Sequence, residues 1–582
     1  MFRRQETAPL LVNEERNDSL DEQDRELLEQ ESRKQVRRER KRLCLCLGLA
    51  LVLTMAAASI TIFMLTRRSL SRIRARNVIM MVSDGFGPAS QSYARSFRQY
   101  KKNYTAEEAV TSLDEILIGA SRTRSSNSLV TDSAAGATAF SCALKTYNAA
   151  VGVDPEGIPC GTVLEAAKEM NMFTGLVVTS RVTHATPASF SAHVVHRDME
   201  ADIAVHQIGD YALGRRVDLM LGGGRCFFLP NTTEGSCRQD DRDLIKESKS
   251  FGWENVIFNR QQLEDMMQKN DDALPLPLLG LFHLDHMSYE VDRKRRFSAE
   301  EPPLNKMAEA ALKTLKTNAQ ASGQGFFLMI EGSKIDLASH SNDPVAHLHE
   351  ILEYHRTIRV VRNFLKENPD TVMISTSDHE TGGFTLGLQP DPRTYPDYLW
   401  KPEVIDRAEA SAELLGKKLV AFLASESRED QRAQDSNGNR HQRIEEFVKT
   451  EILEKGLHIT DPSEEEIKFL STADTQPFDY LLRFIGRAIS KRAYLGWTTA
   501  GHTGVDVNLY AESSQDQDDW ILDRLRGNHE NTDIGDFLTW YLNLDLEPIT
   551  KRLVRSADKW FKPKGGFSSN GRVQSQHEMT GQ

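Results

Sequence analysis

The run Val78-Ile-Met-Met-Val82, followed directly by Ser83-Asp84-Gly-Phe-Gly87, sets the pattern for most of the chain. The run is short and apolar, as expected for a buried strand, and a polar segment begins where it ends. Four further runs have the same character and are separated by amphipathic segments: residues 175–179, 217–221, 326–330 and 372–375. This alternation predicts an α/β fold with a mostly parallel central sheet flanked by helices.

Side chains that can bind metals or take part in catalysis follow four of these five runs within a few residues. They are Asp84 after the first run, His184 and Thr186 after residues 175–179, Glu331 and Asp336 after residues 326–330, and Asp378 and His379 after residues 372–375. The carboxyl ends of parallel strands form the ligand crevice of an open α/β sheet. We therefore expect these side chains to meet at one edge of the sheet.

The types and spacing of these residues indicate a metal centre. Asp336 and His340 are four residues apart, on one face of a helical turn, and His502 lies in a loop flanked by glycines. Mixed Asp and His ligands suit Zn²⁺, whereas an oxygen-only set suits Mg²⁺. Each motif alone is more often an ordinary loop or a solvated helix face, but their joint position at strand ends favours a metal site.

The remaining histidines carry a weaker signal. His347, His349 and His355 fall on a helical stretch and are predicted to lie on the surface. His283 and His286 are predicted to be structural.

A candidate nucleophile lies in Thr131-Asp132-Ser133, ahead of the small residues Ala-Ala-Gly-Ala-Thr-Ala. This pattern predicts a closely packed helix with Ser133 at its start. A serine there can simply cap the helix, but the helix N-terminus also favours a developing alkoxide. Arg197 could hold two oxygens of a phosphate with its planar fork.

Residues 43–66 contain no charged residue and would span about 36 Å as a helix. The run is too long and too far from Met1 for a cleaved signal peptide, so it predicts one transmembrane signal anchor. Seven basic residues between 33 and 42 precede it, against five between 67 and 76 after it. This difference favours a cytoplasmic N-terminus, a single-pass type II orientation.

Cysteines and glycosylation signals place the large domain in a secretory-pathway lumen. Four cysteines follow the apolar run and could form two disulfides: Cys142, Cys160, Cys226 and Cys237. The close spacing of Cys226 and Cys237 favours a bridge between these two. Sequons at Asn103 and Asn231 lie on the same side.

Composition excludes some classes of protein, and local patterns define the order of the domains. Of the 582 residues, 39% are apolar, which excludes global disorder, and the net charge of −12 argues against a nucleic-acid partner. We predict a disordered cytoplasmic tail at 1–42, the anchor at 43–66, a basic stalk at 67–76, a catalytic domain at 77–550 with a charged helical insertion at about 390–480, and a flexible basic tail at 551–582. In the first tail, Glu6, Leu10 and Leu11 resemble an acidic dileucine signal for a sorting adaptor.

Between about residues 75 and 510 these motifs, in this order, resemble the alkaline phosphatase family, most of all its fungal vacuolar, membrane-anchored members. The resemblance implies a homodimeric hydrolase of small phosphate monoesters in the vacuolar lumen, with two Zn²⁺ and one Mg²⁺ per subunit. It implies that Ser133 is phosphorylated, that Arg197 clamps phosphate, and that Asp132 orients Arg197.

The resemblance also implies a ligand set for each metal. The zinc that activates Ser133 would be held by Asp84, Asp378 and His379, the other zinc by Asp336, His340 and His502, and the magnesium by Asp84, Thr186 and Glu331. Two positions depart from the bacterial pattern. His184 stands where bacterial enzymes have Asp, and Leu337 replaces a His or Lys that often helps to hold phosphate.

Two alternatives remain at this stage. A related phosphodiesterase or sulfatase is one, but a sulfatase would have a modified Cys in place of Ser133, and a diesterase would not need Arg197 or a third metal. The other is a catalytically silent, membrane-anchored binding protein, which should have lost some of these ligands.

Overall fold

The computed structural model describes residues 22–70, 76–270, 273–433, 437–514 and 519–562. The chain divides into two compact units, Met1–Arg74 and Ala75–Gln582.

The described residues of the first unit form one helix, α1 (Glu22–Leu70), so residues 22–42 are helical where a disordered tail was predicted. These residues are rich in Glu, Gln, Lys and Arg, which favour helices, and an ion pair of 3.2 Å joins Glu29 to Arg33 one turn later. Among the described residues no helix combines the length and apolar character needed to cross a membrane, so the predicted transmembrane helix is not found. Glu6, Leu10 and Leu11 lie outside the described residues.

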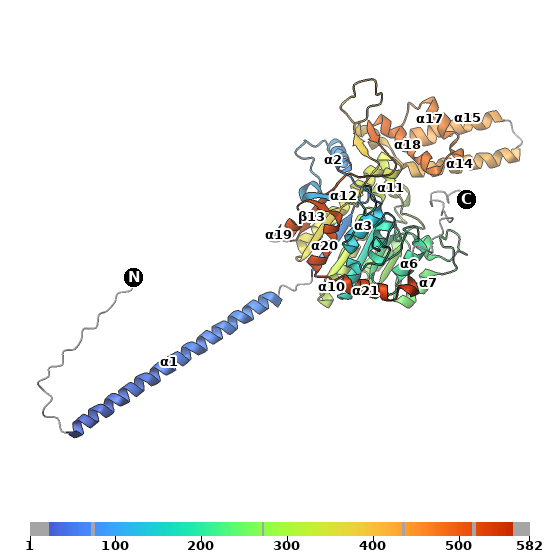
Figure 1. Cartoon of the computed structure of the whole chain (residues 1–582). Helices are drawn as coiled ribbons and strands as arrows, with labels where there is room; N and C mark the ends of the chain where they lie inside the picture. The colour runs from blue at the N-terminus through green and yellow to red at the C-terminus, as the bar shows by residue number, and fades with distance from the viewer. Residues whose placement is uncertain (1–21, 71–75, 271–272, 434–436, 515–518, 563–582) are drawn as a thin grey trace. The chain divides into compact units, whose positions relative to one another are not determined.

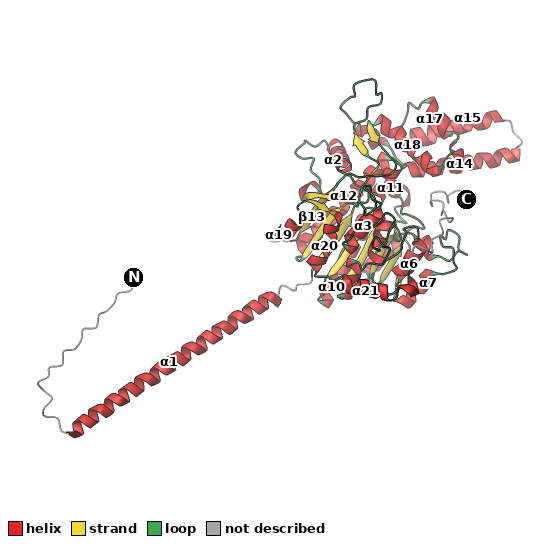
Figure 2. Cartoon of the chain, in the orientation of Figure 1, coloured by secondary structure: helices red, strands yellow, loops and turns green. Residues whose placement is uncertain are grey.

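The second unit is built on a ten-stranded sheet, drawn in yellow between helices in Figure 2. In spatial order its strands are β14 (Gly527–Glu530), β2 (Leu117–Arg122), β13 (Val507–Ser513), β8 (Thr371–Thr376), β1 (Asn77–Val82), β7 (Phe326–Glu331), β3 (Phe173–Arg181), β4 (Leu219–Gly223), β6 (Leu278–Leu281) and β5 (Asn255–Ile257). Only β13 runs antiparallel to its neighbours. The predicted mostly parallel sheet is confirmed.

The five predicted runs correspond to the central strands β8, β1, β7, β3 and β4. The five unpredicted strands lie toward the two edges of the sheet, where strands are shorter or less apolar. For example, β2 is half exposed and β5 has three residues. Such segments lack the continuous apolar run that marks a strand buried on both faces.

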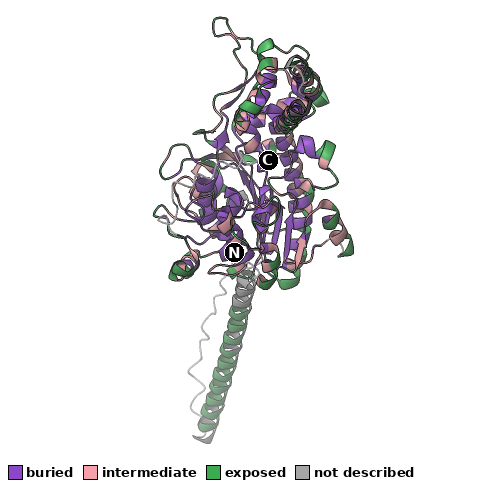
Figure 3. Cartoon of the chain, turned by 90° about the vertical axis from the view of Figure 1, so that its right-hand side faces the viewer, coloured by how far each residue is buried: buried purple, intermediate pink, exposed green. Residues whose placement is uncertain are grey.

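Alternate residues of the central strands pack against opposite helical layers. Ile79 and Met81 belong to one apolar cluster, and Val78, Met80 and Val82 to another. The first cluster includes α10 (Leu304–Ser322) and α12 (Pro344–Glu367), and the second includes α3 (Ser133–Cys142) and α20 (Asn531–Leu542). Figure 3 colours the buried residues purple. The two-residue period of a strand produces both layers.

The charged region predicted at about 390–480 is helical, and its helices project beyond the sheet in Figure 1. They are α13 (Pro402–Arg407), α14 (Ala412–Ala433), α15 (Asn437–Phe447), α17 (Glu464–Leu470) and α18 (Phe478–Arg492). Leu415 and Leu419 of α14 pack in the same apolar cluster as Leu482 and Ile485 of α18. These helices thereby join the main core.

Part of the C-terminal segment predicted to be flexible is ordered. Residues 551–562 include the end of α21 (Glu547–Arg555) and α22 (Ala557–Trp560), and Leu553 is fully buried. The Trp560 ring packs against His193, His206 and Tyr211. Apolar residues one turn apart on α21 explain this docking, because they form one face that the domain covers. Residues 563–582 lie outside the described residues.

Both disulfides allowed by the four downstream cysteines are present. Cys226 pairs with Cys237, as predicted, and Cys142 pairs with Cys160. The second bridge ties the end of α3 to the segment that precedes α4 (Val163–Glu169).

Candidate active site

The predicted site residues meet at the carboxyl edge of the sheet. Asp84 follows β1, Glu331 ends β7 and Asp378 follows β8, and these three side chains are completely buried. Gly85 has a φ of +73°, and a Cβ there would lie 2.7 Å from the Cα of Asp336. Only glycine allows this turn together with such a close approach.

Ser133 is the first residue of α3, as predicted, and Asp132 is its N-cap, accepting a 3.0 Å hydrogen bond from the Ala135 amide. The Ser133 hydroxyl lies 3.0 Å from Nε2 of His379. The small residues of α3 permit this proximity, because a Cβ on Gly136 would already be 3.0 Å from the Asp378 Cβ. A buried serine at a helix N-terminus is thus held against the loop that follows β8.

Arg197 is oriented from two sides. It donates to Asp132 Oδ2 at 3.1 Å and to His184 Nε2 at 3.0 Å. Burial, together with the charges of Arg197 and Arg181, holds the pKa of His184 well below its usual range. His184 is therefore a neutral acceptor that fixes the guanidinium beside Ser133 in one cavity.

One candidate cation site is formed by Asp84, Asp378 and His379, whose ligand atoms lie within 4.8 Å of one another. His379 Nε2 is 3.4 Å from Asp84 and 3.2 Å from Asp378. Its Nδ1 lies 3.0 Å from the Thr381 hydroxyl, which donates to Asp336 at 2.6 Å. Since that hydroxyl accepts from Nδ1–H, Nε2 presents a lone pair to the two carboxylates.

The second candidate cation site surrounds Asp336. The Nδ1 atoms of His340 and His502 lie 2.6 and 2.8 Å from the carbonyl oxygens of Ala500 and Thr131. Each Nδ1 therefore carries the proton, and the two Nε2 lone pairs face each other at 3.2 Å. Two lone pairs this close repel each other unless a cation or a proton lies between them. A hydrogen bond from the other ring nitrogen to a backbone carbonyl, as both rings have here, is typical of metal-binding histidines.

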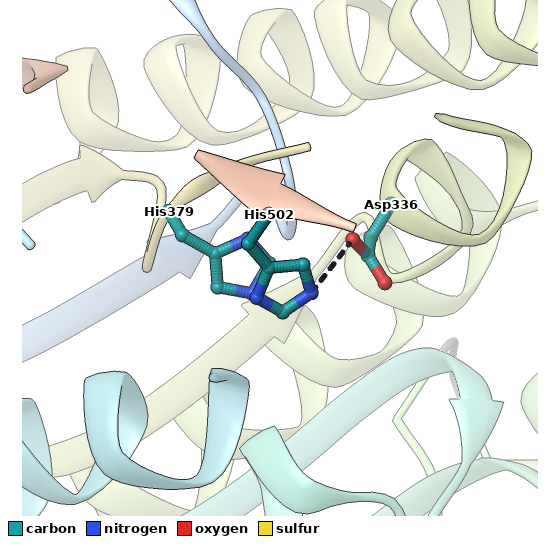
Figure 4. Close-up of side chains that lie close together, drawn as sticks. All are labelled: Asp336, His379 and His502. Atoms are coloured by element: carbon teal, nitrogen blue, oxygen red, sulfur yellow. Dashed lines mark ion pairs between the residues drawn. The ribbon is translucent and has the colours of Figure 1, made fainter. Parts of the chain in front are cut away.

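Figure 4 shows Asp336 with His502 and His379, whose rings stack 3.5 Å apart. These three residues also have ligand atoms within 4.8 Å of one another. His379 therefore contacts both candidate sites, whereas the prediction assigned it to one of them. Nε2 of His340 lies 3.2 Å from Oδ2 of Asp336.

A set of buried oxygens completes the centre. Among the described residues, both carboxylate oxygens of Asp84, Oδ2 of Asp378, Oε1 of Glu331 and the Thr186 hydroxyl have no hydrogen-bond partner. Burial of such oxygens without a partner is costly. Burial, with the charges of Asp378, Asp336 and Glu331, raises the pKa of Asp84, and burial raises the pKa of Glu331 to about 7. These residues therefore fit bound cations.

A cavity of about 350 Å³ is lined by Ser133 and Arg197 together with residues that the sequence did not identify as part of the site. His283 and His286, predicted to be structural, line it. The His286 ring lies 5.2 Å from that of His184 and contacts Arg181 at 2.7 Å. Strand β6 was not predicted, so His283 and His286, which follow its carboxyl end, were not recognised as candidate site residues.

The prediction that His347, His349 and His355 lie on the surface is wrong. His347 and His355 are buried in α12, and His349 is half-buried. His347 lies 2.9 Å from the Ser339 hydroxyl and 2.8 Å from that of Ser90. Burial lowers the pKa of His347 to about 4 and that of His355 to about 3. α12 packs against neighbouring helices as well as the sheet, so more than one of its faces is covered.

Comparison with known proteins gives consistent matches. Residues 75–544 match the family model described as alkaline phosphatase. The chain is 45% identical over 488 residues to the repressible alkaline phosphatase of Saccharomyces cerevisiae and 46% identical over 484 residues to an alkaline phosphatase of Schizosaccharomyces pombe, covering 82% of this chain and 83% of each relative. A solved cold-active alkaline phosphatase from Shewanella sp. is 29% identical, with a TM-score of 0.62, over 80% of this chain and 99% of the other.

Proposed function

Because this chain belongs to the alkaline phosphatase family of phosphomonoester hydrolases, we propose that it hydrolyses phosphate monoesters through a phosphoserine at Ser133. The observation that carries this proposal is the 3.0 Å approach of the Ser133 hydroxyl to His379, between the two candidate cation sites and at the N-terminus of α3. Positive charge from bound cations and from the helix N-terminus would lower the pKa of the serine hydroxyl and so make it a nucleophile.

The chain's own residues account for binding and orientation. Ser133 Oγ forms a bond to phosphorus as the bond to the ester oxygen breaks, and water then takes the place of Ser133 and releases phosphate. Arg197 binds two phosphoryl oxygens, held in position by Asp132 and His184. The N-terminus of α3 adds its partial positive charge to the same oxygens.

Members of the family depend on metals, and we propose that this chain binds two Zn²⁺ and one Mg²⁺ per subunit. The two groups of Asp and His ligand atoms and the buried oxygens without hydrogen-bond partners support this proposal. Asp84, Asp378 and His379 would hold the zinc next to Ser133, while Asp336, His340 and His502 would hold the other. The oxygen donors Asp84, Thr186 and Glu331 would hold magnesium. When bound, the metals lower the pKa of the serine hydroxyl and stabilise the leaving alkoxide.

The function is tested by measuring metal content together with turnover of 4-nitrophenyl phosphate, bis(4-nitrophenyl) phosphate and 4-nitrophenyl sulfate. We expect zinc and magnesium to copurify and the monoester to be the preferred substrate. Preference for the diester or the sulfate would favour the alternative enzymes. Absence of turnover in the metal-loaded protein would favour a silent binding protein.

His184→Asp is expected to tighten magnesium binding. The neutral imidazole of His184 adds no negative charge near Asp84, Thr186 and Glu331, whereas a carboxylate would favour a hard cation there. We expect half-maximal activation at about tenfold less magnesium, and weaker inhibition by excess zinc, in a magnesium titration at fixed zinc.

The matched control is His184→Asn, which removes the imidazole without adding charge. It should leave the magnesium dependence close to that of the wild type. If the His184→Asp and wild-type titrations superimpose, residue 184 does not control this site.

We further propose that the catalytic unit is a homodimer in the vacuolar lumen. Its two disulfides and the sequons at Asn103 and Asn231 support an oxidising, glycosylating route. Protease protection of intact vacuoles and sensitivity to an endoglycosidase test the location, and light scattering tests the dimer. Carbonate extraction distinguishes an anchored form, as the uncharged run at 43–66 predicts, from a soluble one.

A further inference from the structure

The outer wall of the active-site cavity comes from the helical insertion. Glu413 and Lys417 lie one turn apart on α14, and Phe478, Asp479, Leu482 and Arg483 form one face at the start of α18. They share the cavity with Ser133 and Arg197. The insertion therefore lines the cavity into which the alcohol part of a phosphate ester at Ser133 would extend.

Two cations in this cavity already have partners. Arg197 pairs with Asp132 at 3.1 Å, and Lys417 pairs with Glu413 at 2.6 Å. The other oxygen of Glu413 lies 3.8 Å from Lys334, so this carboxylate is shared between two lysines. Asp285, on the same wall, is paired with Arg181 at 2.7 Å.

Arg483 differs from these cations. It is half-buried, and within the part of the chain that the structure describes it has neither an ion pair nor a hydrogen bond. Asp479 lies one turn earlier on α18 and lines the same cavity. A guanidinium in a recess next to Phe478 and Leu482 has lost part of its hydration without gaining a counter-ion.

We propose that Arg483 binds a second anionic group of the substrate. The preferred substrates would then be small phosphate monoesters whose alcohol part carries a further carboxylate or phosphate. Either group accepts two parallel hydrogen bonds from a guanidinium. A cavity of about 350 Å³ has room for a small ester between Arg197 and Arg483. The inference rests on the proposed phosphomonoesterase function and adds a class of substrate to it.

The test compares esters that differ by one charge. The first pair is 4-carboxyphenyl phosphate and its uncharged analogue 4-carbamoylphenyl phosphate, and the second is butane-1,4-diyl bisphosphate and butyl phosphate. In the wild type we expect kcat/KM to be about tenfold higher for the anionic member of a pair. The pair that shows this preference identifies whether the second group is a carboxylate or a phosphate.

Arg483→Gln should remove the preference by raising KM for the anionic ester, while kinetics with the neutral ester stay unchanged. Arg483→Lys should retain part of the preference. Lys491→Gln changes an exposed cation on the same helix, outside this cavity, and should have no effect.

Absence of a preference in the wild type in both pairs would overturn the inference. An equal loss for both members of a pair in Arg483→Gln would also overturn it, because a general structural role would produce that result. Failure to hydrolyse any of these monoesters would instead overturn the proposed function, and the substrate class with it.

Discussion

Replacement of Ser133 by Ala is expected to lower the turnover of phosphate monoesters by at least about a thousandfold. The only hydroxyl removed is the one that lies 3.0 Å from His379 between the candidate cation sites. Arg197 and the helix N-terminus remain, so the residual hydrolysis should be water attacking the bound ester directly. The measurement is turnover together with trapping of a labelled phosphoenzyme after acid quenching.

The variant should keep its full complement of zinc and magnesium, which elemental analysis measures. Ser126→Ala, at an exposed serine in the same segment, serves as the control and should behave as the wild type. Undiminished trapping of phosphoenzyme in Ser133→Ala would show that the nucleophile is another residue.

Removal of the metals is expected to cost more stability at pH 8 than at pH 5. In the folded, metal-free protein, burial raises the pKa of Glu331 to about 7 and also raises that of Asp84. A carboxyl whose pKa is raised by folding stabilises the folded state below its unfolded pKa, and this stabilisation is lost as pH rises through the folded pKa. Glu331 alone would lower the free energy of unfolding of the metal-free protein by on the order of 3 kcal/mol as the pH rises from about 4.5 to 7.

Bound metals act in the opposite direction, because they bind the deprotonated carboxylates and so compete with protons. The stabilisation by the metals is the free energy of unfolding in urea of the protein loaded with zinc and magnesium minus that of the chelated protein, and it should therefore grow from pH 5 to pH 8. Buried groups away from the metals affect both forms alike and cancel in this difference. Glu350 and Asp343 have raised pKa values, about 8 and about 6, and His347 and His355 have lowered ones, about 4 and about 3.

Glu331→Gln is the matched variant, since it removes the titrating group and keeps the shape. In this variant the stabilisation by the metals should grow less between pH 5 and pH 8. If the chelated and loaded proteins show the same trend with pH, the buried oxygens do not hold the metals.

Local sequence patterns were sufficient for the centre of the sheet and for the residues that follow its strands. A strand buried on both faces must be apolar throughout, and the polar residue at its end must lie at the carboxyl edge. Asp84, Glu331 and Asp378 are placed there by that rule alone. The start of α3 is equally local, because Asp132 caps the helix and small residues follow.

The sequence by itself thus determined the α/β architecture, the edge of the sheet that carries the site and the residues gathered there. Only the tertiary structure decided that His347 is buried, that His379 contacts both candidate cation sites, that His286 lies beside His184, and that Arg483 of the insertion lines the cavity. The physical reason is that periodicity shows which face of an element is apolar but not which distant segment covers it. That choice depends on packing between elements far apart in the chain.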